Sequence, residues 1–252
     1  MNYINLSDEN IAAEHICCAI SDKKCLEGYE LKKQWIAREL KNGFVFRKLN
    51  ERAKVFIEYG PAEKAWLPIY APNYYALGCF WVSGQHKGKG HGKALLDFVV
   101  QEAKKNKKSG IVTVVGTKKL HFLSDTKWLL KQGFSVCDTL SYGYSLLSMS
   151  FDEKKKPRFN DSVRSGECEQ KKGYVAYYSN RCPFTEYHVA HELMETLKKR
   201  GKHCTIIKLT SCEDAQNAPS PATIFSLFHN GKYVTNDLSV CLDSRWDKVM
   251  TK

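Results

Sequence analysis

The stretch that decides the fold is residues 80–96, which read Phe-Trp-Val-Ser-Gly-Gln-His-Lys-Gly-Lys-Gly-His-Gly-Lys-Ala-Leu-Leu. An apolar strand leads into it, and a helix with apolar residues on one face follows to about residue 105. The alternate glycines between them lack a Cβ, so the backbone can approach a bound group closely. Free N–H groups at a helix start, the helix dipole and nearby lysines all attract an anion. The stretch therefore predicts a strand–loop–helix that binds a pyrophosphate.

Two common nucleotide motifs do not fit this loop. A P-loop ends in Gly-Lys-Ser/Thr, but Ala94 follows Gly92-Lys93, which leaves no hydroxyl for magnesium. A dinucleotide-binding fold needs repeated parallel βαβ units, and these are not apparent in the chain. A different kind of cofactor loop is indicated.

The loop resembles the acetyl-CoA loop of the GNAT N-acetyltransferase superfamily, whose pattern is Gln/Arg-x-x-Gly-x-Gly/Ala. Two registers are open, 85–90 and 87–92. The second is preferred because Lys-Ala-Leu-Leu at 93–96 continues the family pattern, although it puts Lys87 at the Gln/Arg position. Residues 128–134, Trp-Leu-Leu-Lys-Gln-Gly-Phe, resemble the family helix that ends Leu-Tyr-x-x-x-Gly-Phe.

This resemblance spans nearly all of residues 1–150 and implies acetyl-CoA as cosubstrate and an amine-bearing small molecule or peptide as acceptor. The strand before the loop would face the pantetheine arm, and the loop would face the pyrophosphate. The residues expected to bind the cosubstrate are Phe80, Trp81, Val82, Lys87, Gly88, Lys89, Gly90, His91, Gly92 and Lys93.

In this family the amine attacks the thioester directly, so a base helps to deprotonate the amine and an acid can protonate the leaving thiolate. The family's usual acid is a Tyr, and Leu129 stands at that position here. Tyr142 and Tyr144 are the candidate substitutes, each of which would otherwise simply pack in the core. Glu58, in an apolar strand, is the candidate base, with a rim carboxylate as the alternative.

The first half is expected to form a mixed α/β (α+β) unit on a largely antiparallel sheet, the GNAT acyl-CoA N-acyltransferase fold. Apolar periodicity and capping residues predict its elements. Helices are expected at 7–20, 26–40, 90–105 and 123–132, and strands at 3–6, 44–49, 53–59, 74–82, 111–115, 135–138 and 142–149.

Residues 151–172 are rich in charge and poor in aliphatic side chains, which predicts a linker between a domain at 1–150 and a second at 173–252. The second domain reads strand, Cys-Pro-Phe-Thr at 182–185, helix to about 199, strand 204–209, then a hairpin around Asn230-Gly231. This order resembles a small thioredoxin-like domain, with Pro221 as its candidate cis-proline. An acetyltransferase followed by such a domain looks like the bacterial YoaP-like acetyltransferases.

Cys182 is the redox candidate, since a helix N-terminus and Arg181 would lower the pKa of its thiol. Thr185 replaces the second cysteine of Cys-x-x-Cys, which leaves monothiol chemistry, with Cys212 as a candidate partner, or a binding role. The other cysteines, including adjacent Cys17-Cys18, are expected to be reduced, packed thiols. No metal site is expected, because His188 and His191 lack further ligands at clear spacing.

The chain has 252 residues and a net charge of +12, with no apolar run long enough to span a membrane and no signal-like start. A cytoplasmic enzyme with no membrane partner is expected. The excess positive charge also fits nucleic acid, but the lysine pairs follow a helix and the aromatics lie in apolar strands, so no nucleic-acid partner is expected. A homodimer stays open. The alternatives to an acetyltransferase are therefore a monothiol oxidoreductase or binding protein using Cys182, and a nucleic-acid binder.

Overall fold

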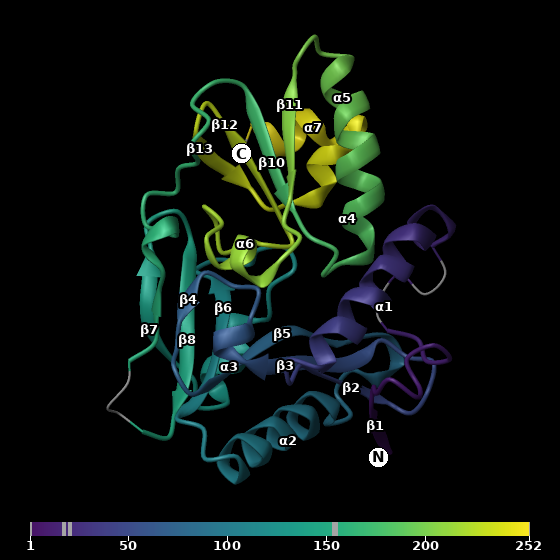
Figure 1. Ribbon diagram of the computed structural model, residues 1–252, viewed down its shortest axis with the longest axis vertical. Helices are drawn as coiled ribbons and strands as arrows, with labels where there is room; N and C mark the ends of the chain where they lie inside the picture. The colour runs from purple at the N-terminus through teal and green to yellow at the C-terminus, as the bar shows by residue number, and fades with distance from the viewer. Residues whose placement is uncertain (1, 17–18, 20–21, 153–155, 252) are drawn as a thin grey trace.

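The computed structural model describes residues 2–16, 19, 22–152 and 156–251, which form two packed α/β parts (Figure 1). The first part is built on a seven-stranded sheet in the order β1-β2-β3-β5-β6-β8-β7, in which only β5 and β6 run parallel. Its strands are β1 (Tyr3–Asn5), β2 (Val45–Leu49), β3 (Val55–Pro61), β5 (Tyr74–Val82), β6 (Gly110–Gly116), β7 (Ser135–Leu140) and β8 (Tyr144–Ser150). The mixed, largely antiparallel sheet predicted from the sequence is confirmed.

Helices cover both faces of this sheet, and the alternation along β3 shows why. Val55 and Ile57 point to one face, where α2 (His91–Lys105) and α3 (Thr126–Lys131) pack, whereas Phe56 points to the other, where α1 (Leu26–Leu40) packs. Side chains of a strand alternate between the two faces, so a fully apolar strand has to be covered on both sides. The three helices lie close to their predicted ranges.

The helix predicted from residue 7 to residue 20 is wrong over its described part. Residues 8–13 form turns, in which the Asn10 side chain accepts the Ser7 N–H at 2.9 Å and donates to the Asn5 carbonyl at 3.0 Å. Such side-chain bonds to nearby backbone compete with helical hydrogen bonds. Cys17 and Cys18 lie outside the described residues.

The second part has a four-stranded sheet in the order β11-β10-β12-β13. β10 (Tyr174–Tyr178) runs parallel to β11 (Cys204–Lys208) and antiparallel to β12 (Phe225–His229), which pairs antiparallel with β13 (Lys232–Thr235). A continuous helical segment joins β10 to β11, made of α4 (Pro183–Tyr187), a π-helical stretch (His188–Leu193) and α5 (Met194–Lys198). Two short helices complete it, α6 (Cys212–Gln216) and α7 (Asp243–Met250).

This element order is the one predicted from the sequence, while the thioredoxin-like assignment stays a prediction. The predicted cis bond at Pro221 is wrong, because no peptide bond among the described residues is cis. A bond from the Ala222 N–H to the Ser220 hydroxyl, 3.1 Å long, closes the turn there instead.

The segment between the parts is packed rather than extended into solvent. Its short strand β9 (Arg158–Phe159) pairs with β4 (Ile69–Tyr70), and Phe159 and Val163 are fully buried. Their few apolar side chains fill one cluster that also holds Ala222 from the second part. The sequence predicted a linker here, parts of which could lie over one of the domains, and a small number of well-placed apolar residues is enough to dock it.

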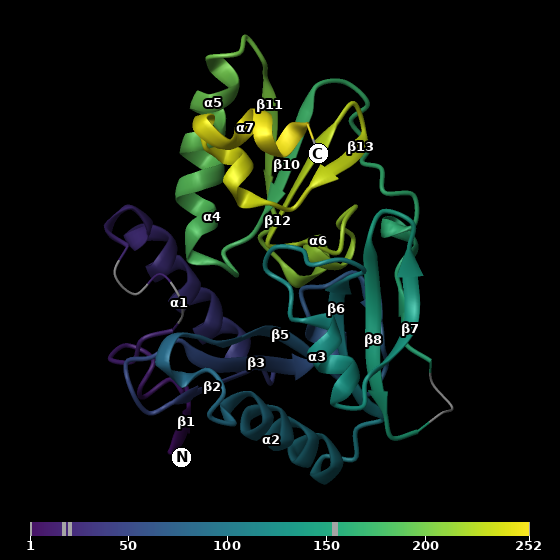
Figure 2. The same cartoon turned by 180° about the vertical axis from the view of Figure 1, so that it is seen from behind.

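The two parts also approach each other along α1 and α4 (Figure 2). At Gly28 of α1 an added Cβ would lie 2.0 Å from the Pro183 carbonyl oxygen. Only glycine lets the two backbones come this close. The second part is therefore held against the same face of the large sheet that α1 covers.

Candidate active site

The glycine loop between β5 and α2 has the backbone geometry that the sequence predicted. Gly84, Gly88 and Gly90 adopt φ values of +61°, +75° and +82°, in the left-handed region that favours glycine. Gly90 is the N-cap of α2, and its carbonyl accepts the Ala94 N–H at 3.0 Å. The preceding N–H groups at the helix start have no carbonyl to reach within the helix, so they can bind an anion.

Gly92, in the first turn of α2, lies against the aromatic side chains of the cleft. Its absent Cβ would lie 3.4 Å from the Trp128 ring, and that ring packs edge-on against Phe80 at 5.5 Å between centroids. Trp128 is fixed in turn, because Asp125 caps α3 by accepting the Trp128 N–H at 2.8 Å. The glycine loop, β5 and α3 are thereby joined into one wall.

A cleft of about 960 Å³ runs along this wall. All of the predicted cosubstrate residues line it except Lys89. The sequence prediction did not include the other lining residues, 117–120 and 123–128, which add the charged side chains of Lys118, Lys119 and Lys127. A cleft lined by positive charge raises the local concentration of anionic ligands.

His91 lies at the inner end of the loop and is buried. Its Nδ1 is 2.8 Å from the Tyr3 hydroxyl, and burial together with the positive charge of Lys89 and the nearby His86 lowers the pKa of its imidazole. A neutral His91 ties β1 to the start of α2.

Beyond the cleft, the two parallel strands separate. β5 pairs with β6 only from Tyr74 to Ala76, and farther along a small cavity of about 40 Å³ opens between Gly78-Cys79 and Thr113-Val114. Arg181 and residues 221–225 of the second part cover this cavity. Leu123 and Ser124 line both the cavity and the cleft, so the two spaces adjoin.

Glu58 lies behind this cavity rather than at a rim. Its side chain is 1% exposed; Oε1 is 2.6 Å from Lys32 Nζ, and Oε2 accepts the Cys79 N–H at 3.1 Å. The pairing of β3 with β5 shifts register here, and the carboxylate satisfies the strand N–H that the shift releases. Both oxygens are thus engaged in holding β3, β5 and α1 together.

Tyr142 and Tyr144 do not reach the cleft. The Tyr142 hydroxyl donates to the Val163 carbonyl at 2.6 Å, and the Tyr144 hydroxyl is 2.5 Å from that of Tyr233 in the second part. Burial raises the pKa of both side chains, so they are poor acids where they stand. Leu129, which stands at the position of the family's tyrosine, is fully buried and has no hydroxyl that could act as an acid.

Cys182 is 6% exposed, so its thiol is largely covered in the folded chain. The Arg181 guanidinium is directed to Trp66 and Thr223, where Nη1 donates to the Trp66 carbonyl and the Thr223 hydroxyl. The predicted effect of Arg181 on the pKa of the Cys182 thiol stays a prediction. The Thr185 hydroxyl donates to the Cys182 carbonyl at 2.8 Å, so this pair closes the helix start. None of the eight cysteines in the described ranges forms a disulfide.

One pair at the cavity was invisible in the sequence. His121 Nε2 lies 3.1 Å from Asp237 Oδ2, and Asn236 donates to the His121 carbonyl at 2.7 Å. The partners come from different parts of the chain, 115 residues apart for the Asn236 bond, so no local pattern could have joined them. Histidine beside a carboxylate is a usual proton acceptor.

Two absences hold for the residues that the structure describes. No group of three or more metal-binding side chains is found there. No helix in the same ranges is long and apolar enough to cross a bilayer.

The comparisons agree with this geometry. A family model described as Acetyltransferase (GNAT) family matches residues 10–123, and one described as YoaP-like matches residues 204–248. The chain belongs to the GNAT family of acetyltransferases. It is 39% identical over 239 residues, covering 94% of both chains, to a Bacillus subtilis (strain 168) protein called "Uncharacterized N-acetyltransferase YoaP". The predicted resemblance to GNAT acetyltransferases and to YoaP-like proteins is confirmed.

Solved structures similar to the chain cover about 60% of it. A putative GNAT acetyltransferase from Desulfovibrio desulfuricans is 14% identical, with 59% of this chain and 98% of that chain covered and a TM-score of 0.44. The PaiA N-acetyltransferase from Thermoplasma acidophilum, solved with coenzyme A, is 17% identical, with 60% and 100% covered and a TM-score of 0.41.

Proposed function

We propose that this acetyltransferase moves an acetyl group from acetyl-CoA to the amine of a small acceptor that enters between the two parts of the chain. One observation carries the proposal: the cleft beside the glycine loop adjoins, at Leu123 and Ser124, a cavity at the point where β5 and β6 separate. A phosphate site at one end and a buried, enclosed space at the other suit a reaction between a phosphorylated donor and a small acceptor.

The cleft fits the cosubstrate by its chemistry. The N–H groups at the start of α2 would bind the pyrophosphate, with Lys87 and Lys93 adding positive charge. Phe80, Trp81 and Val82 would lie along the pantetheine arm, where β5 has no parallel partner to take its backbone groups. Acetyl-CoA would supply the activated acyl group, and residues of this chain would bind the acceptor and transfer the proton.

In the reaction the amine nitrogen forms a bond to the acetyl carbon, the bond from that carbon to sulfur breaks, and the amine loses one proton as the thiolate gains one. We assign the proton acceptor to His121, oriented by Asp237 at 3.1 Å, because it lines the acceptor cavity. Glu58 stays a predicted base from the sequence, but its two engaged oxygens favour a structural role. Tyr142 and Tyr144 also stay predictions, with their hydroxyls bonded elsewhere.

The division into 1–150, 151–172 and 173–252 stays part of the proposal, but the second part is now assigned a role at the acceptor site of the first. The second part supplies Arg181 and residues 221–225 to the acceptor cavity, and Asp237 to the His121 pair. We infer that it works as a cap that completes the acceptor site. Burial of Cys182 argues against an independent thiol oxidoreductase.

The test is titration calorimetry with CoA, together with release of free thiol from acetyl-CoA in the presence of amines. Gly90→Asp and Gly92→Asp each put a carboxylate and a Cβ where the pyrophosphate would bind. Loss of one or two charged hydrogen bonds should raise the dissociation constant of CoA by about 10- to 100-fold. Gly201→Asp is the matched control, because Gly201 also has a positive φ, +61°, with open space around it.

Wild-type CoA affinity in folded Gly90→Asp and Gly92→Asp variants would show that the loop is not the cosubstrate site. No binding of CoA to the wild-type chain at millimolar concentration would refute the proposed function itself.

A further inference from the structure

We propose that the acceptor carries a carboxylate beside its amine, as a free amino acid does, and that Arg181 binds this carboxylate between Trp35 and Trp66. This inference rests on the proposed function, because it names the acceptor class of the same site. Arg181 belongs to the second part, so the cap would recognise the acceptor.

The first observation is the state of the Arg181 guanidinium. Its side chain is 8% exposed and forms no salt bridge with any carboxylate in the described ranges. The two carboxylates whose charges act on Arg181 are bonded elsewhere, Glu58 to Lys32 at 2.6 Å and Glu39 to the Asn42 amide at 3.2 Å. A buried cation without a paired anion is costly, and a bound carboxylate would remove that cost.

Hydrogen bonds fix one end of the guanidinium and leave the other open. Nη1 donates to the Trp66 carbonyl at 3.0 Å and to the Thr223 hydroxyl at 2.8 Å, and that hydroxyl donates to the same carbonyl at 2.6 Å. Within the described residues, Nε is buried without an acceptor. Because the fork is rigid, fixing Nη1 also fixes the direction of the remaining donors.

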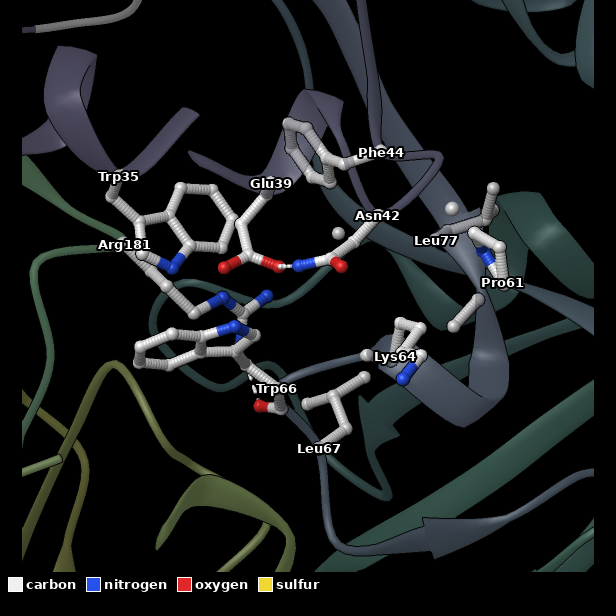
Figure 3. A pocket seen from close by; sticks show the side chains of 14 residues that line it. Trp35, Glu39, Asn42, Phe44, Pro61, Lys64, Trp66, Leu67, Leu77 and Arg181 are labelled. Atoms are coloured by element: carbon white, nitrogen blue, oxygen red, sulfur yellow. Dashed lines mark hydrogen bonds between the residues drawn. The ribbon is translucent and has the colours of Figure 1, made fainter. Parts of the chain in front are cut away.

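Two further N–H donors without hydrogen-bond acceptors flank the Arg181 guanidinium. Figure 3 shows the guanidinium between the indole rings of Trp35 and Trp66, with the Glu39 carboxylate nearby. In the part of the chain that the structure covers, Trp35 Nε1 and Trp66 Nε1 are both buried without a hydrogen-bond partner. Buried polar groups are nearly always paired, and here all three orphans are N–H donors. A carboxylate offers only acceptors, so its chemistry matches this set of donors.

The spaces on either side of Arg181 are small. It lines the cavity of about 40 Å³ that adjoins the cleft and a second of about 30 Å³ beside Trp35 and Trp66. Since one water occupies about 10–15 Å³ of such volume, each cavity has room for two to four atoms of ligand. That fits an amine on the cleft side and a carboxylate at Arg181. It does not fit a folded protein's lysine, whose backbone the cap would exclude.

The test compares amino acids with their carboxamides as acceptors, following thiol release from acetyl-CoA. Each pair keeps the amine and the side chain and removes only the negative charge. We expect kcat/KM to be about 10- to 100-fold higher for the acids, the worth of a charged hydrogen bond. Equal values for acids and amides, or activity confined to polyamines or peptides, would overturn the inference.

Variants then locate the effect. Trp66→Phe and Trp35→Phe keep an aromatic ring and remove one N–H donor, so KM for acids should rise more than KM for amides, and the ratio of kcat/KM between acids and amides should fall. Arg181→Lys should abolish the preference for acids; Arg245→Lys, an exposed arginine, should preserve it. If Arg181 only held the two parts together, its variant would lower activity on acids and amides equally, which would also overturn the inference.

Failure of the inference differs from failure of the proposed function. Thiol release with amines regardless of charge would leave an acetyltransferase with another acceptor class. Absence of CoA binding would remove both. If Arg181→Lys does not fold, the wild-type comparison and the two tryptophan variants still decide the matter.

Discussion

Breaking the buried pair between Lys32 and Glu58 should remove much of the stability of the first part. The two side chains are 2% and 1% exposed and 2.6 Å apart. Lys32→Met leaves the Glu58 carboxylate buried without its cation, and removal of one partner from such a pair costs about 3–5 kcal/mol. Whole domains are stable by only about 5–15 kcal/mol, so the loss should be plain in urea denaturation.

The double variant Lys32→Met/Glu58→Gln separates charge from packing. It keeps the net charge, and the Gln oxygen can still accept the Cys79 N–H that Glu58 accepts at 3.1 Å. We expect it to recover at least half of the loss, because neither position 32 nor position 58 then holds an unpaired charge. Lys171→Met is the exposed control, since Lys171 pairs with Glu167 at the surface and such pairs contribute about 0–1 kcal/mol.

The free energy of unfolding would be measured by tryptophan fluorescence and circular dichroism in parallel. A cost below about 1 kcal/mol for Lys32→Met, with no recovery in the double variant, would refute the reasoning. Retention of thiol release by the double variant would further show that Glu58 is structural rather than the base; loss of activity with intact CoA binding would restore it as a catalytic candidate.

Three more outcomes follow from single contacts. Gly28→Ala should destabilise the chain by about 1–2 kcal/mol in urea denaturation, because the clash of a Cβ 2.0 Å from the Pro183 oxygen outweighs the gain in helix propensity. Gln34→Ala, on the exposed side of the same helix, is the control and should not destabilise it. Burial raises the pKa of Tyr233 from 10 to about 12, so stability should fall as pH rises from 10 toward 12, because the unfolded chain loses that proton first; Tyr233→Phe should flatten this fall. Cys182 should alkylate with iodoacetamide only slowly in the native chain, because it is buried, and at the ordinary rate in urea; fast native labelling would restore the reactive thiol.

Local patterns predicted most of the first part. The glycine loop could be predicted because its glycines and the start of the following helix all lie within residues 83–93. The positive φ angles and the position of the N-cap in the structure agree with that prediction. The strands and α1, α2 and α3 followed from apolar periodicity. The helix expected at residues 7–20 failed where the side chain of Asn10 bonds to nearby backbone, a choice that periodicity does not report.

The residues expected to bind the cosubstrate lie together along one cleft, except Lys89, because the conformation of the β5–α2 loop is set by neighbouring residues. Their role in binding stays a prediction. The catalytic candidates fared differently: Glu58 is tied to a lysine on another element, and Tyr144 to a tyrosine of the second part. No sequence spacing reveals such partners.

The sequence by itself determined the glycine loop and most of the helices and strands, since a glycine's freedom and a strand's alternation are properties of short segments. Tertiary structure decided what closes the proposed acceptor site. From the sequence, Arg181 was considered only for its effect on the pKa of the adjacent Cys182 thiol. In the structure its side chain extends into the first part of the chain, beside Trp35 and Trp66. Adjacency in sequence fixes where a Cα lies, whereas the direction of a long side chain is set by the donors, acceptors and apolar surfaces that folding brings around it.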